Sequence, residues 1–223
     1  MRTIVCYGDS NTWGFIPLTE EGDPEAPARF PYDVRWTGVL ARLLGDEYRV
    51  LEEGLNGRTT AFNDVLGKYR NGAKYLGVCL ATAKPLDLLV IMLGSNDTKN
   101  YMHVSPSGIG RGAEKLIRIA RASGCGPNEA PPKILLVSPA RLRDEIQTSV
   151  MRLEFDQGSI QKSYELAEVF FDTARRHDCY YMNAAVYTEA GKADGLHLDA
   201  KNHRKLAAAL CTKITEIFDP ESL

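Results

Sequence analysis

The sequence lacks the features that mark secreted, membrane-spanning or nucleic-acid-binding proteins. Only Arg2 stands between the initiator and the first apolar run, so we expect no secretory leader. No apolar run approaches the roughly 18 to 20 residues that a membrane-spanning helix needs. Lys+Arg number 27 against Asp+Glu 29, a net charge of -2. This balance favours neither nucleic acid nor a membrane surface as a partner.

Cysteine is too sparse and too scattered for a disulfide framework. The chain has 5 cysteines, an odd number, and most of them stand inside apolar stretches. Buried free thiols in a reducing compartment explain this distribution better than disulfides or a zinc site. We therefore expect a cytoplasmic protein.

Short apolar runs alternate with longer helical patterns, as in a parallel sheet covered by helices on both faces. Five runs are strand candidates: 3–7, 48–52, 86–93, 133–138 and 179–183. Helical patterns cover 34–44, 107–122, 160–176 and 200–218, with Ser105 or Ser107 and Asp199 as candidate caps. Because 223 residues can bury one core and no linker is visible, we expect a single α/β domain over residues 1–223.

Three connections are longer than the usual loop: 15–31, 124–132 and 139–158. Long ordered loops in compact domains serve as lids, pocket walls or subunit contacts. Simple surface insertion is an equally open interpretation for each of them. The irregular pattern of 139–158 also leaves room for a short helix.

A serine follows the first predicted strand directly, in Gly8-Asp9-Ser10. In open α/β sheets, ligands bind outside the carboxyl ends of the strands. A hydroxyl at that place can act as a nucleophile. Helix capping by Ser10 or Asp9 is the alternative interpretation of the same residues.

A carboxylate and an imidazole stand just before the last predicted helix, in Asp194-Gly195-Leu196-His197. A serine hydroxyl needs a base to remove its proton, and histidine suits this task near neutral pH. A carboxylate bonded to the other ring nitrogen fixes the tautomer. Asp194 and His197 therefore form a candidate acid–base pair.

The remaining histidines carry weaker signals. His203 stands four residues after Asp199 in a helical pattern, which favours a local surface pair. His103 has no carboxylate partner nearby in sequence, and His177 lies in a charged segment that favours a solvated role. A metal site built from Asp194, His197, Asp199 and His203 is conceivable, but helical spacing points the two imidazoles in different directions. We expect no metal.

Acyl transfer also needs donors aimed at the oxyanion that develops on the carbonyl, and two segments at predicted strand ends could supply them. The segment 53–60 contains Gly54 and Gly57, whose bare backbone can approach a ligand closely. The segment Gly94-Ser95-Asn96-Asp97 places a side-chain amide after the third strand. Each segment alone is also typical of a turn.

Taken together, these motifs resemble the four sequence blocks of the SGNH (GDSL-like) hydrolases. The blocks are Gly8-Asp9-Ser10, Gly57 in its Asn-Gly-Arg turn, Gly94-Ser95-Asn96-Asp97 and Asp194-Gly195-Leu196-His197. The longer strings at 8–14, 33–40, 52–55 and 91–99 are similar to the bacterial arylesterase/acyltransferase branch, whose members can also perhydrolyse esters. That branch can carry alanine where Gly57 stands.

The resemblance implies a three-layer, flavodoxin-like fold with a five-stranded parallel sheet. It also implies Ser10 as nucleophile, His197 as base and Asp194 as orienting acid. The oxyanion hole would consist of the Ser10 and Gly57 N–H groups and the Asn96 side chain. We further expect Asp9 and Trp13 to contact substrate.

The resemblance predicts a cofactor-free esterase that acts on short-chain acetyl or aryl esters through an acyl-serine intermediate. Alcohols or peroxide are candidate acyl acceptors, and compact homo-oligomers, often octamers, are typical of the branch. Carbohydrate acetylesterase, thioesterase and lysophospholipase are alternatives that use the same machinery. A catalytically silent binding module and a flavodoxin-like FMN carrier are the alternatives from other classes, because fold alone does not determine function.

Overall fold

A five-stranded parallel sheet forms the centre of the protein. The structure is a computed structural model, and it describes residues 1–17 and 28–219. The strands are β1 (Arg2–Gly8), β2 (Tyr48–Gly54), β3 (Leu88–Met92), β4 (Lys133–Ser138) and β5 (Tyr180–Asn183). Their order is β2-β1-β3-β4-β5, and every neighbouring pair is parallel. This is the flavodoxin-like order, so the predicted sheet is confirmed.

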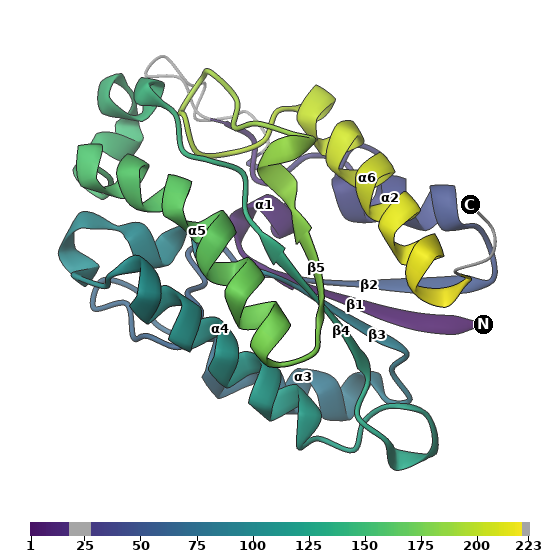
Figure 1. Cartoon of the computed structure of the whole chain (residues 1–223). Helices are drawn as coiled ribbons and strands as arrows, with labels where there is room; N and C mark the ends of the chain where they lie inside the picture. Colours follow the sequence, from purple (N-terminus) through teal and green to yellow (C-terminus); the bar gives the residue numbers. More distant parts are fainter. Residues whose placement is uncertain (18–27, 220–223) are drawn as a thin grey trace.

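Helices cover both faces of this sheet (Figure 1). One face carries α2 (Trp36–Leu44) and α6 (Ala200–Phe218), and the other carries α3 (Gly72–Ala83), α4 (Pro106–Arg121) and α5 (Gln157–Arg176). Alternate residues of β1 face the two layers: Ile4 and Cys6 belong to the core under α2 and α6, whereas Val5 and Tyr7 belong to the core under α3, α4 and α5. The two faces are therefore both buried, as the continuous apolar runs predict.

The predicted helix caps are largely confirmed. Ser105 Oγ accepts a hydrogen bond from the Gly108 N–H over 3.2 Å, and Asp199 Oδ1 accepts one from the Asn202 N–H over 2.8 Å. Two α-helices lie where no helix is predicted, the four-residue α1 (Ser10–Trp13) and α3.

Short 3₁₀ helices occupy several connections. The segment 139–158 contains η4 (Asp144–Thr148) and η5 (Val150–Leu153), which confirms that it holds short helical turns. The others are η1 (Asn96–Thr98), η2 (Asn100–Met102), η3 (Pro127–Glu129) and η6 (Ala184–Val186). Of the predicted loop 15–31, residues 18–27 lie outside the described residues.

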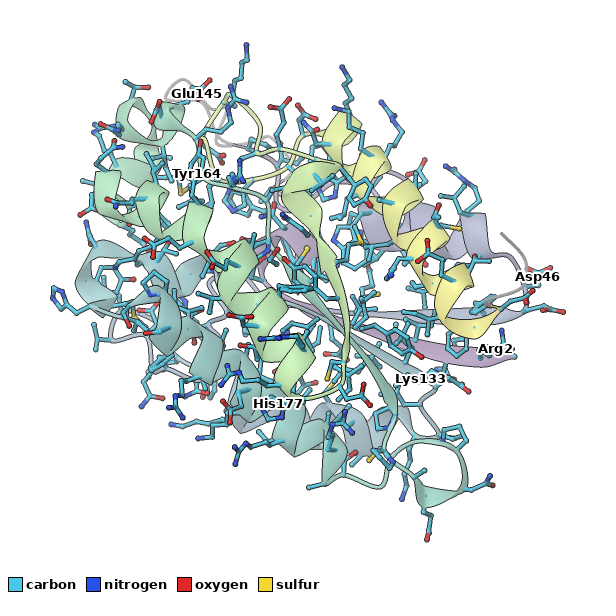
Figure 2. The ribbon with its side chains drawn as sticks, in the orientation of Figure 1. Arg2, Asp46, Lys133, Glu145, Tyr164 and His177 are labelled. Carbon is cyan, nitrogen blue, oxygen red and sulfur yellow. The ribbon has the colours of Figure 1, made fainter. Side chains whose placement is uncertain are left out.

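Three neighbouring strands end at the same level. Gly8 at the end of β1 pairs with Gly54 of β2 and with Met92 of β3. The segments that follow these strands therefore leave the sheet together at its carboxyl edge. Arg2 and Lys133, the first residues of β1 and β4, lie at one end of the molecule, and Glu145, in the segment after β4, lies at the other (Figure 2).

Within residues 1–17 and 28–219, none of the helices combines the length and the apolar character that a membrane crossing requires.

Candidate active site

Ser10 is the first residue of α1 and lies directly beyond the end of β1. Asp9 caps this helix, because its Oδ1 accepts a hydrogen bond from the Asn11 N–H over 3.0 Å. Two glycines allow α1 to sit tightly on the strand ends. A Cβ on Gly8 would lie 2.0 Å from Thr12 Oγ1, and one on Gly54 would lie 2.2 Å from the Trp13 nitrogen. Because Gly8 and Gly54 have no side chains, α1 can pack directly on the strand ends and place Ser10 at the carboxyl edge of the sheet.

A tight turn before α6 positions His197. Asp194 Oδ1 accepts hydrogen bonds from the backbone N–H groups of Leu196 and His197, each over 2.9 Å. Gly195, which follows Asp194 directly, has a φ of +71°, and a Cβ there would lie 2.4 Å from the Ile146 nitrogen. This turn therefore requires glycine, and it brings the Asp194 carboxylate within hydrogen-bond distance of the His197 ring.

Ser10, His197 and Asp194 form one continuous line of hydrogen bonds. His197 Nε2 lies 3.0 Å from Ser10 Oγ, and His197 Nδ1 lies 2.6 Å from Asp194 Oδ2. All three residues are buried, with exposed fractions of 5% or less. This geometry places a base on the serine hydroxyl and a carboxylate on the far side of the imidazole, which is the arrangement that activates a serine nucleophile.

The charge of Asp194 is maintained in spite of its burial. Burial raises the pKa of this carboxyl, but the hydrogen bond and charge of His197 and the two backbone donors outweigh it, so the pKa lies below its ordinary value. The carboxylate is therefore ionised at neutral pH and favours an imidazolium beside it.

The predicted oxyanion donors lie on the segments that leave the neighbouring strands. Gly57 stands three residues after β2 and has a φ of +76°, in the left-handed region that favours glycine. Asn96 begins η1 after β3, and its Nδ2 donates to the Arg58 carbonyl over 3.1 Å. Because an amide nitrogen carries two hydrogens, this bond leaves the second one for a ligand.

Arg58 joins these segments to β1, a role that sequence reasoning missed. Its Nη1 donates to the Gly8 carbonyl over 2.9 Å and also to the Glu53 carbonyl. Its own carbonyl accepts from Asn96, so one residue links the carboxyl ends of β1, β2 and β3. The only signal in the sequence is that Arg58 directly follows Gly57.

The sequence model of the GDSL-like lipase/acylhydrolase family matches residues 6–205, which span the whole site. The chain belongs to this GDSL-like family. No curated protein matches the chain significantly.

Solved structures similar to this GDSL-like chain include esterases over their full length. An aryl esterase from M. smegmatis is 39% identical, with a TM-score of 0.86 over 97% of this chain and 99% of that one. A carbohydrate acetylesterase from Sinorhizobium meliloti is 37% identical, with a TM-score of 0.87 over 98% and 100%. A putative arylesterase from Agrobacterium tumefaciens is 33% identical, with a TM-score of 0.85 over 97% and 100%. Together with the family, these likenesses identify the chain as a carboxylic-ester hydrolase with the SGNH fold.

The two residues predicted to contact substrate in this GDSL-like hydrolase, Asp9 and Trp13, differ from each other in exposure. Asp9 is 2% exposed, and its carboxylate is engaged as the cap of α1. The structure thus gives Asp9 the capping role that was the alternative interpretation, and its contact with substrate stays a prediction. Trp13 is half-buried at the end of α1, where the Arg29 guanidinium lies 4.8 Å from its ring. Contact between Trp13 and substrate stays a prediction.

Two further residues beside the triad were missed. Phe15 places its ring 4.5 Å from the His197 ring, centroid to centroid. Asn11 hydrogen-bonds to the backbone on both sides of His197. Neither contact leaves a local pattern, because each joins residues more than 180 positions apart.

The prediction for His203 is wrong. This residue is fully buried, and its Nδ1 accepts a hydrogen bond from the Trp36 N–H over 3.2 Å, so it forms no surface pair with Asp199. Burial lowers its pKa from 6.5 to about 4, so it is neutral at pH 7. His177 is also less solvated than predicted, because its Nε2 lies 3.5 Å from Glu114 Oε1. In the described part of the chain, His, Cys, Asp and Glu side chains form no group of three suited to a metal ion.

A separate cavity of about 1060 Å³ lies beside β2 and the start of α3. Its lining is mixed in charge and includes Arg58, Arg70, Lys74, Glu53 and Tyr75. None of the three triad residues is among those that line it. The oxyanion segment 53–60 borders this cavity through Glu53, Gly54, Leu55 and Arg58.

Proposed function

We propose that this esterase cleaves short-chain acetyl or aryl esters with Ser10 as nucleophile, His197 as base and Asp194 as orienting acid. The continuous line from Asp194 through His197 to Ser10 carries the proposal. No metal or organic cofactor enters the reaction, since the side chains and backbone of this site supply the base and the oxyanion donors.

In the proposed reaction, Ser10 Oγ bonds to the carbonyl carbon while its proton passes to His197 Nε2. The N–H groups of Ser10 and Gly57 and the free hydrogen of Asn96 Nδ2 stabilise the oxyanion. The bond to the alcohol then breaks, and the alcohol leaves with the proton from His197. Water then bonds to the acyl carbon and gives a proton to His197 Nε2. The bond between that carbon and Ser10 Oγ breaks, His197 returns the proton to Oγ, and the acid leaves.

Hydrolysis of p-nitrophenyl acetate by Ser10→Ala tests the assignment of the nucleophile. We expect turnover to fall to background in a variant whose circular dichroism is unchanged. Ser107→Ala, an exposed serine on α4, is the matched control and should retain full activity. Full turnover by a folded Ser10→Ala would reject the proposal.

Preference for short acyl chains is the second part of the proposal. The Phe15 ring, whose centroid lies 4.5 Å from that of the His197 ring, supports it, because a bulky side chain beside the base limits the size of the acyl group that fits there. Acetyl, butyryl and octanoyl esters, each assayed with and without an alcohol, measure this preference and the share of transfer to alcohols. Peroxide in place of the alcohol measures perhydrolysis.

Acetylated carbohydrate is a second candidate substrate class, favoured by the likeness to the Sinorhizobium meliloti carbohydrate acetylesterase. Release of acetate from an acetylated sugar faster than from aryl acetates at equal concentration would favour it. Thioester and lysophospholipid substrates in the same panel test the two remaining alternatives.

We propose in addition a homo-oligomer, with the octamer as the expected assembly. Val65, Leu66 and Tyr69 are 79%, 68% and 87% exposed within one loop, and Leu153 in the segment 139–158 is 79% exposed. Clustered exposed apolar side chains mark protein contacts. Light scattering should give a lower mass for Leu66→Glu or Leu153→Glu than for Leu43→Glu, a control on α2. A monomeric wild type would contradict the proposal.

A cytoplasmic location and a single domain over residues 1–223 complete the proposal. All 5 cysteines are free, which supports a reducing compartment. A single domain predicts one cooperative transition in urea, followed in parallel by circular dichroism and tryptophan fluorescence.

A further inference from the structure

The side chain of Asn11 connects the helix of the nucleophile to the segment of the base. Its Oδ1 accepts a hydrogen bond from the Leu198 N–H over 2.8 Å, and its Nδ2 donates to the Leu196 carbonyl over 3.3 Å. Leu196 and Leu198 are the two chain neighbours of His197. One amide therefore holds the backbone on both sides of the imidazole.

Asn11 is itself fixed in place. It follows Ser10 in α1, its own N–H donates to Asp9 Oδ1 over 3.0 Å, and it is 5% exposed. Since Ser10 and Asn11 are consecutive in one helical turn, a bond to Asn11 is in effect a bond to the element that carries the nucleophile. The position of His197 relative to Ser10 thus depends on the Asn11 amide.

The segment 190–197 has other anchors that do not involve α1. The Arg143 N–H donates to the Gly195 carbonyl over 3.0 Å, and Ser149 Oγ donates to the Asp194 carbonyl over 3.0 Å. The Gly191 N–H donates to the His197 carbonyl over 2.7 Å. These bonds hold the turn to the segment 139–158 and to itself, so loss of Asn11 should shift the turn relative to Ser10 rather than unfold it.

We propose that Asn11 is a positioning residue that sets the distance between Ser10 Oγ and His197 Nε2. The proposal rests on the roles of Ser10 and His197 given under Proposed function. The amide oxygen and nitrogen of Asn11 both bond to the backbone beside His197, so Asn11 acts on the reaction through the imidazole. Asparagine suits the task because its amide offers a donor and an acceptor side by side, so it can bond a C=O and an N–H of one extended segment.

Asn11→Leu tests this role, because leucine has a similar size and forms neither bond. Displacement of a catalytic group by about 1 Å can cost about 100-fold in rate, so we expect kcat on p-nitrophenyl acetate to fall about 10- to 100-fold. KM should stay within about twofold. The rate at which a fluorophosphonate labels Ser10 should fall in parallel with kcat, because labelling also needs the His197 base. Asn11→Asp keeps the acceptor for Leu198 and should give an intermediate kcat.

Asn183→Leu is the matched control. Asn183 is half-buried at the end of β5, and its Oδ1 accepts from the Ala185 N–H over 3.0 Å, so this change also removes a capping amide but at the far edge of the sheet. Should Asn11→Leu fail to fold, Asn11→Ser removes the same two bonds without a bulky apolar group and carries the test.

The outcomes separate this proposal from the proposed function. A folded Asn11→Leu with wild-type kcat and labelling rate would overturn it, as would a rise in KM at unchanged kcat or an equal loss in Asn183→Leu. An inactive wild type or an active Ser10→Ala would instead overturn the proposed function.

Discussion

The guanidinium of Arg58 donates a hydrogen bond to the carbonyl of Gly8 over 2.9 Å and lies 4.2 Å from the ring of Tyr7. The loop that carries Gly57 is thereby fastened to the strand that ends beside Ser10. Among the described residues, no carboxylate forms an ion pair with this buried guanidinium. Burial raises the pKa of the Asp9 carboxyl, and the positive charge of Arg58 is among the effects that lower it, so this charge lies close both to Asp9 and to the proposed oxyanion donor Gly57.

Arg58→Ala should lower kcat by at least about 10-fold, because two proposed donors lose their common support and a developing negative charge loses a nearby cation. The truncation also enlarges the adjoining cavity, so guanidinium ions at millimolar concentration should restore part of the rate. Arg70→Ala is the control, since Arg70 lines the same cavity but pairs with Asp64 over 2.7 Å. Absence of rescue in a folded Arg58→Ala would limit Arg58 to a structural role.

Asn96→Ala should lower kcat about 100- to 1000-fold with little change in KM, the loss typical of removing one oxyanion donor. Steady-state kinetics on p-nitrophenyl acetate give both constants. Asn63→Ala, in the loop beside the cavity, is the control and should retain activity. A change confined to KM would show that Asn96 binds the substrate equally in its ground and transition states.

Gly57→Ala should destabilise the protein by about 1 to 2 kcal/mol, because an L-residue is strained in the left-handed region. Its φ is +76°, and a Cβ would lie 2.6 Å from Arg70 Nε. Urea denaturation measures the free energy of unfolding. Gly77→Ala is the contrasting control: Gly77 lies inside α3 with open space around it, so alanine should stabilise by about 0.5 to 1 kcal/mol. Equal stability of Gly57→Ala and wild type would mean that the loop relaxes around the new methyl group.

The sheet and four of the long helices could be predicted because their signals are local. The apolar run of β3 and the spacing of Leu206, Leu210 and Ile214 in α6 each reflect the faces that they bury. In α3, by contrast, Gly72 and Gly77 weaken the helical signal, and packing on the sheet decides the outcome. The short α1 has no periodicity at all and depends on the Asp9 cap.

The catalytic candidates could be found because they stand at strand ends and helix starts, where polar residues in an apolar context are conspicuous. The contacts that hold the surrounding residues in place could not be predicted. His203 accepts from the Trp36 N–H, 167 positions away, and Asn11 reaches Leu198, 187 positions away. Such partners are set by the tertiary fold, so a local pattern such as the spacing of Asp199 and His203 misleads.

The two buried carboxyls of Asp9 and Asp97 predict a stability that falls as pH rises. Burial raises the pKa of Asp9 from 3.8 to about 6 and that of Asp97 from 3.8 to about 7, and the charge of Asp9 contributes to the latter. Between the ordinary and the raised pKa, the folded state holds a proton that the unfolded state has lost. The free energy of unfolding therefore decreases from about pH 4 to about pH 7.

Asp97→Asn removes one of the two carboxyls whose titration makes the stability depend on pH. The variant loses stability at pH 5, because the protonated Asp97 carboxyl meets the Thr60 N–H and hydroxyl with one carbonyl oxygen and one O–H, whereas an asparagine amide brings a second N–H hydrogen that needs an acceptor at this buried position. At pH 8 the wild type has to keep a buried charge that the variant lacks, so the difference between the two should shrink. Urea denaturation at pH 5 and pH 8 measures it, with the exposed Asp172→Asn as control. A difference that is constant or grows with pH would mean that Asp97 is already ionised in the folded protein at pH 5.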